Sequence, residues 1–300
     1  MVRLVTRAAR SGLRRYPGAL SGALRDRAAP ARPASNDLRA LPDQPFAASW
    51  LGHAGVLFRQ GGQTVLVDPV LSDRIGVRVG HRVLGPKRLT PAPVSPDGLP
   101  PIDLLLITHA HFDHLDRPTL AALASSRTSV VTARGTRRLI PRGFRRVIEV
   151  DWDQSTDLER LTLRALRPNH WGARFALDRA RGFNSYLVQS SDRSVLAAGD
   201  TALTGAFRGV GPVDLALLGI GAYDPWEHKH ATPEQAWTMF RGARGRYLMP
   251  IHHSTFELSD ERIDEPIERL LRAAGEDSRR LVLPAPGSVW TPEQEMPPVR

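Results

Sequence analysis

Short apolar runs, most of them ending near Gly, Pro or Asp, recur along this chain and alternate with longer amphipathic stretches. The short runs predict strands, and the amphipathic stretches predict helices. The expected strands are 46–60 and 64–68, joined as a hairpin around Gly61-Gly62, and then 102–108, 129–132, 161–167, 185–189, 194–198, 213–218 and 247–251. The expected helices are 118–125, 233–241 and 263–273. Strands followed by a helix, repeated in two halves, predict an α/β fold with two sheets packed face to face and helices outside.

The same pattern divides the 300 residues into one domain with a tail at each end. We expect a folded domain at 45–292, a basic tail at 1–44 and a short C-terminal tail at 293–300. Apolar residues near the start of the chain recur at helical spacing, which favours an amphipathic helix. Gly12, Pro17 and the linker-like sequence RAAPARPAS favour a disordered tail instead, so both interpretations stand.

The stretch THAHFDHLD at 108–116 combines three histidines with two aspartates directly after the apolar run IDLLLI. His109 and His111 are two residues apart, so they project to the same side at the end of a strand. Asp113 and His114 follow where the chain must turn. Imidazole together with carboxylate is a ligand set that suits zinc and related transition metals, so this stretch predicts a metal site.

Three more candidate ligands stand at points where an apolar run ends. They are His170 in RPNHWGAR, Asp200 in VLAAGDT and His252 in YLMPIHHST. With the first cluster they make a set of five histidines and two aspartates, which is too large for one zinc ion with its usual four ligands. A set of this size suits two metal ions that share a carboxylate and a water molecule.

At these positions the chain resembles the metallo-β-lactamase superfamily, whose HxHxDH motif, later His, bridging Asp and final His occur here in the same order. The resemblance covers about residues 50–271 and implies a four-layer αββα sandwich. Within the superfamily the chain is similar to the N-acyl phosphatidylethanolamine-hydrolysing phospholipase D group. The segments that carry this similarity are WLGHAGVLF, VLVDPVLSDR, GPKRLTPAPV, NHWGAR, GAYDPW, HATPEQA, IHHSTFELSDE and DEPIERL.

The resemblance also implies which residues hold which metal. The first ion is assigned to His109, His111 and His170, the second to Asp113, His114 and His252, and the bridge to Asp200. His253 is the alternative to His252, because the phospholipase group tends to have an aromatic residue after this ligand. Two Zn²⁺ ions are expected, with Mn²⁺ or Fe²⁺ as alternatives.

Further residues are expected close to the metals. The resemblance places Asp68 beside the cluster, where its carboxylate could orient a ligand histidine; a strand-ending turn is its alternative role. His230 precedes a helix amino terminus, which favours anions, and is expected to bind a phosphate or to donate a proton at the mouth of the site. His53 in LGHAG is either a second orienting residue or an ordinary turn histidine. The residues expected to act in catalysis are Asp113, Asp200, His230 and Asp68.

Two metals and a trapped water predict hydrolysis, because the ions lower the pKa of the water from 15.7 towards about 7 and supply a bridging hydroxide at neutral pH. The resemblance implies a phosphodiesterase of phospholipase D type that acts on N-acyl phosphatidylethanolamine-like lipids. A lactonase or another hydrolase of a small phosphorylated metabolite is the alternative. A nuclease is less favoured, because most of the excess positive charge is in the N-terminal tail and no aromatic-rich binding motif interleaves with the basic residues.

The surroundings of the predicted site bear on its substrate. The loop 74–96 carries Arg74, Arg78, Arg82, Lys87 and Arg88 with no acidic residue. These side chains either face solvent or contact a phosphate head group. The aromatic residues Trp171, Tyr223, Trp226 and Phe256 either line an acyl-chain groove or pack in the core.

Composition narrows the possible classes of protein. The net charge is +10, and the first 50 residues hold nine arginines against three acidic residues, so the N-terminal segment is the expected point of any peripheral membrane contact. The absence of cysteine excludes a thiol nucleophile and thiolate metal ligands. No apolar run reaches the roughly 20 residues that a membrane span needs. The expected location is the cytoplasm, with or without membrane contact; nucleic acid is not an expected partner.

Overall fold

The computed structural model describes residues 37–39, 44–175, 178 and 180–292. The predicted C-terminal tail lies outside the described residues, as does most of the predicted N-terminal tail. Leu38, within that predicted tail, is buried, and its backbone N–H donates to the carbonyl of Gly98 at 2.8 Å. The chain therefore already contacts the domain before Ala47, the first residue of its first described strand.

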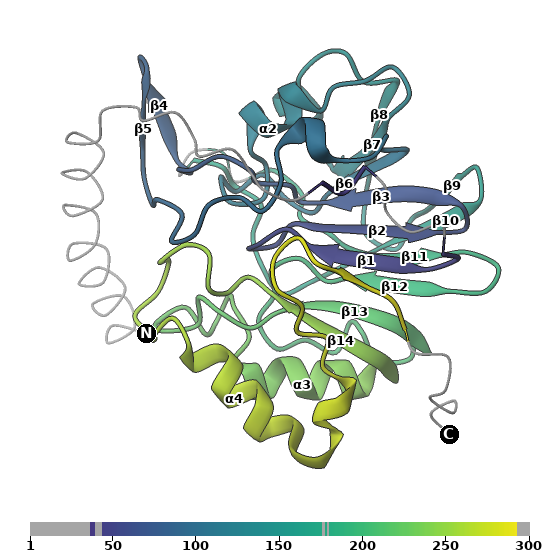
Figure 1. The fold of residues 1–300 in the computed structure, drawn as a ribbon. Helices are drawn as coiled ribbons and strands as arrows, with labels where there is room; N and C mark the ends of the chain where they lie inside the picture. The colour runs from purple at the N-terminus through teal and green to yellow at the C-terminus, as the bar shows by residue number, and fades with distance from the viewer. Residues whose placement is uncertain (1–36, 40–43, 176–177, 179, 293–300) are drawn as a thin grey trace.

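Two sheets form the centre of the described structure (Figure 1). The first has the order β15-β1-β2-β3-β6-β7-β8, with β1 (Ala47–Trp50), β2 (Val56–Gln60), β3 (Gln63–Val67), β6 (Leu104–Ile107), β7 (Ser129–Ala133), β8 (Arg146–Val150) and β15 (Val289–Trp290). The second has the order β14-β13-β12-β11-β10-β9, with β9 (Ser155–Leu158), β10 (Leu161–Leu166), β11 (Ser185–Gln189), β12 (Ser194–Ala197), β13 (Val213–Gly219) and β14 (Gly245–Ile251).

The remaining elements are short. The helices are α2 (Arg117–Ala122), α3 (Pro233–Gly242) and α4 (Glu265–Ala274), with 3₁₀ turns at Pro96–Gly98, Arg137–Leu139 and Gly275–Arg280. Strands β4 (Val77–Val79) and β5 (Arg82–Leu84) pair only with each other among the described strands and form a hairpin that projects from the domain (Figure 1). No helix in the described ranges is both long and apolar enough to cross a membrane.

Three groups of buried apolar side chains separate the layers. Between the two sheets, Leu106 of the first sheet packs in one cluster with Leu163 and Leu217 of the second. On the outer face of the first sheet, Leu105 clusters with Leu120 of α2. The outer face of the second sheet is covered by α3 and α4, whose apolar residues form a third cluster with strands β12, β13 and β14. These clusters confirm the predicted αββα layering.

The strands with strong apolar runs agree closely with the prediction, but two details were wrong. Residues 46–60 form two strands, β1 and β2, because the backbone reverses at Gly52 (φ +87°) and His53 (φ +52°). Strands β4, β5, β8, β9 and β15 were not predicted; β8, β9 and β15 are edge strands of the two large sheets and lack a continuous apolar run. An edge strand needs fewer buried residues, so its sequence pattern is weaker.

Parallel pairing brings the ends of several strands to one edge of the structure. Strands β3 and β6 are parallel in the first sheet, and β12, β13 and β14 are parallel in the second. The residues that directly follow their carboxyl ends are Asp68, Thr108, Ala198, Ile220 and His252, respectively, and Asp200 comes two residues after Ala198. Polar residues that follow these strands are therefore collected at one place although they are far apart in the sequence.

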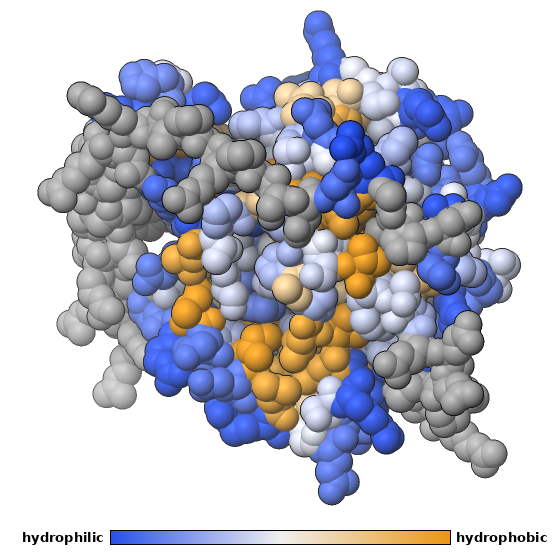
Figure 2. Space-filling model, viewed as in Figure 1, coloured by the Kyte–Doolittle hydropathy of each residue, from blue (hydrophilic) through white to orange (hydrophobic). Residues whose placement is uncertain are grey.

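Apolar residues gather on another part of the surface. Figure 2 shows apolar residues gathered near the lower centre of one face, where Figure 1 shows the chain that follows α4. Leu283 in this part of the chain is 45% exposed. This apolar area lies on the α3–α4 side of the molecule, away from the β4–β5 hairpin (Figure 1).

The inter-sheet core makes a direct stability prediction. Leu106 is fully buried between the sheets, so Leu106→Ala should lower the free energy of unfolding by about 2–5 kcal/mol through lost burial and a cavity. Val79→Ala, at a half-exposed position of β4, should change it by no more than about 0.5 kcal/mol. Urea unfolding of both variants measures the difference, and equal effects would contradict this description of the core.

Candidate metal centre

The loop 108–116 begins where β6 ends and is held by Asp68, which ends the neighbouring strand β3. The backbone N–H of Thr108 donates to Asp68 Oδ1 at 2.8 Å, and the Thr108 hydroxyl donates to Asp68 Oδ2 at 2.6 Å. Gly199 lies against the same threonine, and a Cβ there would sit 2.9 Å from Thr108 Cβ. The loops before the HxHxDH motif and before Asp200 are therefore in close contact.

The first group of candidate ligands contains His109, His111, His170 and Asp200. His109 Nε2 lies 2.8 Å from His111 Nδ1, and His170 Nε2 lies 3.4 Å from the same atom. Asp200 Oδ2 completes the group, at 3.7 Å from His109 Nε2 and 3.6 Å from His170 Nε2. The three histidines assigned to the first metal thus converge on one oxygen of Asp200.

The second group contains Asp113, His114 and His252, the ligands proposed for the second metal, and His53 lies close enough to belong to the same cluster. Asp113 Oδ2 lies 3.7 Å from His114 Nε2 and 3.2 Å from His252 Nε2. The other oxygen of Asp200, Oδ1, lies 3.2 Å from His114 Nε2 and 3.3 Å from His252 Nε2. Asp200 therefore offers one carboxylate oxygen to each group.

The donor set fits zinc. Zinc ligands at about 2.0–2.2 Å in a tetrahedron lie about 3.3–3.6 Å from one another. The distances of 3.2–3.7 Å within the second group and to Asp200 Oδ1 are close to this spacing. His114 Nε2 and Asp200 Oδ1 are also buried without a hydrogen-bond partner in the described part of the chain. Buried polar atoms without a partner are costly, and a cation between them would remove that cost.

Contacts outside the two groups fix the rings of the histidines. His114 Nδ1 donates to Asp68 Oδ2 at 2.7 Å, His109 Nδ1 lies 3.0 Å from the Thr108 hydroxyl, and His170 Nδ1 donates to the carbonyl of Lys229 at 3.0 Å. With the proton on Nδ1, each of these rings would present its Nε2 lone pair to a bound cation. The predicted contact between Asp68 and a ligand histidine is present in the structure.

Burial and neighbouring charges shift the pKa values of the carboxyl groups in this cluster in opposite directions. Burial lowers the pKa of His109 and His170 well below the usual value, which keeps both neutral. Burial opposes ionisation of Asp113 and Asp200 as well, but the neighbouring histidines, led by His114, hold the pKa of both carboxyls well below the usual range. The cluster without metal therefore contains two carboxylates and neutral imidazoles that can act as ligands.

The pKa values of two histidines in the cluster are raised and not lowered. Burial again lowers the pKa of His114 and His252, but the nearby carboxylates, Asp200 first, outweigh it and raise the pKa of His114 well above its usual value and that of His252 to about 9. Both rings are protonated at neutral pH when no cation is present. A metal ion that binds the second group must displace these protons.

All seven proposed ligands lie together in the structure. The structure also distinguishes His252 from His253, the two candidates for the last ligand. His252 belongs to the cluster, whereas the ring of His253 stacks on Trp50 with centroids 4.7 Å apart. His253 Nε2 lies 3.3 Å from the carbonyl of Pro250. The side chain of His253 therefore packs away from the candidate metal centre.

Two further histidines border the centre. His230 Nδ1 lies 3.8 Å from Asp200 Oδ2, and the His230 ring packs beside His170 and His252. His53 Nε2 lies 2.9 Å from Asp113 Oδ2. His230 thus borders the proposed metal groups, and His53, for which the sequence left two roles open, contacts a proposed ligand.

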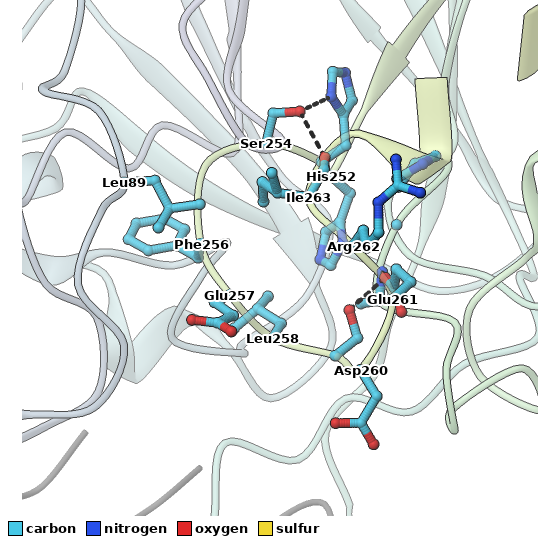
Figure 3. Close-up of a pocket in the computed structure, with 15 residues that line it drawn as sticks. Leu89, His252, Ser254, Phe256, Glu257, Leu258, Asp260, Glu261, Arg262 and Ile263 are labelled. Carbon is cyan, nitrogen blue, oxygen red and sulfur yellow. Dashed lines mark hydrogen bonds between the residues drawn. The ribbon is translucent and has the colours of Figure 1, made fainter. Parts of the chain in front are cut away.

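A cavity of about 370 Å³ lies along the chain that follows His252 (Figure 3). Its apolar lining includes Leu89, Phe256, Leu258 and Ile263, and its polar lining includes the pair formed by His253 and Ser254. Figure 3 shows the charged side chains of Glu257, Asp260 and Arg262 around the same cavity. A mixed polar and apolar space thus adjoins one ligand of the centre.

Some residues of the basic loop and some of the aromatic residues are buried and stabilise the fold, whereas others are exposed near the cluster. Arg88 is buried, and its guanidinium donates to the carbonyls of Val70 at 2.6 Å and Leu51 at 3.3 Å, so it holds the loop in place. Tyr223 is buried and donates to Glu265 at 2.8 Å. Trp171, by contrast, contacts the His111 ring and is 44% exposed, so it borders the open side of the cluster.

Comparison with known proteins agrees with this geometry. The profile of the β-lactamase superfamily domain matches residues 63–253, which include all seven proposed ligands. The chain belongs to the β-lactamase superfamily. The observed αββα layers are the metallo-β-lactamase fold, and the relatives within it include metal-dependent hydrolases. This chain is accordingly a metal-dependent hydrolase of the superfamily.

Individual relatives extend the comparison. An uncharacterized protein of Mycobacterium tuberculosis is 33% identical over 270 residues, which cover 84% of this chain and 70% of the relative. N-acyl-phosphatidylethanolamine-hydrolyzing phospholipase D 1 of Caenorhabditis elegans is 29% identical over 275 residues, covering 81% of this chain and 75% of the relative. The crystal structure of isothiocyanate hydrolase from Delia radicum gut bacteria matches with a TM-score of 0.65 at 17% identity, covering 82% and 98% of the two chains. The last similarity supports the fold alone.

Asp200→Asn tests the shared ligand. The amide keeps the shape of the side chain but removes the negative charge that faces both groups, so metal content should fall from two ions per chain to one or none while the fold is retained. Elemental analysis with circular dichroism measures both quantities. Asp157→Asn, in the exposed edge strand β9, is the control. Retention of two ions and of activity in Asp200→Asn would refute the bridging assignment.

His253 makes a prediction about pH. Burial lowers its pKa to about 4, so between pH 4 and 6.5 the unfolded chain binds the proton more readily than the folded protein. The contribution of neutral His253 to stability is present above pH 6.5 and is lost as the pH falls towards 4. His253→Phe should therefore lose less stability on acidification than the wild type, in urea unfolding of metal-free protein. His81→Phe, on the exposed β4–β5 turn, should keep the wild-type slope; an unchanged slope in His253→Phe would contradict the prediction.

Proposed function

We propose that this protein is a binuclear zinc phosphodiesterase of phospholipase D type that hydrolyses N-acyl phosphatidylethanolamine-like lipids. The observation that carries the binuclear part is the position of Asp200, whose two oxygens face separate groups of ligands. The substrate part is supported by the similarity to the phospholipase D of C. elegans. Mn²⁺ or Fe²⁺ would suit the same nitrogen and oxygen donors.

The proposed roles follow from the positions of the side chains. His109, His111 and His170 would hold one ion, Asp113, His114 and His252 the other, and Asp200 both. Bound divalent ions lower the pKa of water to about 7 and stabilise charge that develops on a phosphoryl oxygen. Asp68 keeps the His114 ring oriented through its hydrogen bond at 2.7 Å.

His230 is the proposed residue that contacts the substrate. Its ring lies beside Asp200, close to His170 and His252, and its side chain is partly exposed. An imidazole at this position can donate a hydrogen bond to a phosphoryl oxygen or to the departing alcohol. Asp113, Asp200, Asp68 and His230 remain the residues to which we assign the reaction.

Exposed aromatic side chains near the centre support an apolar substrate. Trp171 lies against His111, and Phe175, which is 52% exposed, packs edge to face on Phe112 two residues before His114. Acyl chains bury apolar surface against such residues at about 25 cal/mol per Å². The basic segment at 1–44 lies mostly outside the described residues, and we propose it as the site of peripheral membrane contact for a cytoplasmic protein.

A second candidate is a lactonase or another hydrolase of a small phosphorylated metabolite. The cavity next to His252 favours it, because charged side chains of Glu257, Asp260 and Arg262 surround the space together with apolar ones. A small polar substrate would be held by such groups better than an acyl chain would.

The deciding experiment is hydrolysis of N-acyl phosphatidylethanolamine in mixed micelles by zinc-loaded protein of measured metal content. We expect release of N-acylethanolamine and phosphatidic acid, and Asp200→Asn protein prepared in parallel should show none. Bis(p-nitrophenyl) phosphate and a panel of lactones are assayed beside the lipid. Cleavage of only the small diester or a lactone would overturn the lipid substrate and favour the second candidate.

A further inference from the structure

Three of the proposed ligand histidines have a hydrogen-bond partner outside the metal groups that fixes the orientation of the ring. The Asp113 carboxylate, also a proposed ligand, needs such a partner too. In the described residues, Asp113 Oδ2 has three close nitrogen neighbours: His53 Nε2 at 2.9 Å, His252 Nε2 at 3.2 Å and His114 Nε2 at 3.7 Å. His114 and His252 are themselves proposed ligands. His53 is therefore the neighbour that remains to hold the Asp113 carboxylate when a metal binds.

The state of the His53 ring suits this task. Its side chain is almost fully buried. Its Nδ1 has no hydrogen-bond partner in the described part of the chain, whereas Nε2 faces Asp113. With a proton on Nε2, the ring donates one hydrogen bond to the carboxylate.

The backbone of His53 also holds the chain at His252. The N–H of His252 donates to the carbonyl of His53 at 2.9 Å, and Trp50 Nε1 donates to the same carbonyl at 2.8 Å. The N–H of His53 donates to the Thr255 hydroxyl at 2.6 Å. Both histidines have a positive φ, of 52° and 62°, which is unfavourable for a non-glycine residue and persists only where the surroundings enforce it.

The turn that carries His53 is itself fixed from behind. Gly52 has φ +87°, and a Cβ there would lie 2.7 Å from Nη2 of the buried Arg88. The Arg88 guanidinium donates to the carbonyl of Leu51, one residue earlier. Phe256 packs edge to face on the His53 ring with centroids 5.2 Å apart. The ring therefore has little freedom to turn away from Asp113.

We propose that His53 is a positioning residue of the second metal group, which sets the Asp113 carboxylate through its side chain and His252 through its carbonyl. This inference rests on the proposed two-metal centre. The first group has no direct contact with His53, because the ring contacts of His53 are with His114, His252 and Phe256. Loss of the imidazole should therefore weaken one metal site and leave the other unchanged.

The test compares His53→Ala, His53→Gln and the wild type in titrations of metal-free protein with Zn²⁺ against a chromogenic chelator. We expect two ions in the wild type and a 10- to 100-fold weaker second ion in His53→Ala, with the first unchanged. His53→Gln keeps an N–H donor within reach of Asp113 and should recover most of the affinity. His253→Ala, which removes an adjacent imidazole that faces away from the centre, is the matched control and should bind as the wild type does.

Ligand counting separates positioning from direct coordination. X-ray absorption of protein saturated with Zn²⁺ should give the same number of histidine ligands in His53→Ala as in the wild type. A loss of one histidine ligand would make His53 a ligand and overturn the proposal, as would unchanged affinity for both ions. A wild type that binds one ion would instead overturn the two-metal centre. Thermal unfolding of the metal-free variants verifies folding, and His53→Gln carries the test if His53→Ala does not fold.

Discussion

The structure depends on the burial of one carboxylate, that of Asp200, among histidines from both sheets. An unpaired buried carboxylate is very costly, so the surrounding groups must supply positive charge, either as protons on His114 and His252 or as metal ions. The loops around it are arranged for this purpose. Gly199 permits the approach to Thr108, and Asp68 fixes the motif that follows β6.

Much of the centre could be predicted from the sequence because its ligands stand in a local pattern. The HxHxDH motif is contained in six residues, and His170, Asp200 and His252 each follow a recognisable apolar run. The strands that precede them are also recognisable, with continuous or nearly continuous buried positions in β6, β12 and β14 and alternating ones in β10. The fold and the grouping of the proposed ligands were predictable for one reason: both depend on short segments whose sequence pattern can be interpreted without knowledge of distant contacts.

The remaining features depend on contacts between distant segments. His53 and Asp113 are 60 positions apart, and no local pattern distinguishes such a histidine from an ordinary turn residue. Arg88 was grouped with a basic loop by composition, whereas the structure uses it to hold backbone carbonyls. The edge strand β9 was missed because only one of its four residues, STDL, is buried, so the strand has no apolar run.

The ligands come from loops of both sheets, with Asp113 and His114 following β6 of the first and Asp200 and His252 following β12 and β14 of the second. Complete coordination of the proposed metals would therefore require the two halves of the sandwich to be docked. Metal binding and docking would then be thermodynamically linked, and stability would rise by RT ln(1 + [L]/Kd) with the free metal concentration. A chelator would then weaken the docking of the two sheets, which the apolar core between them also holds together.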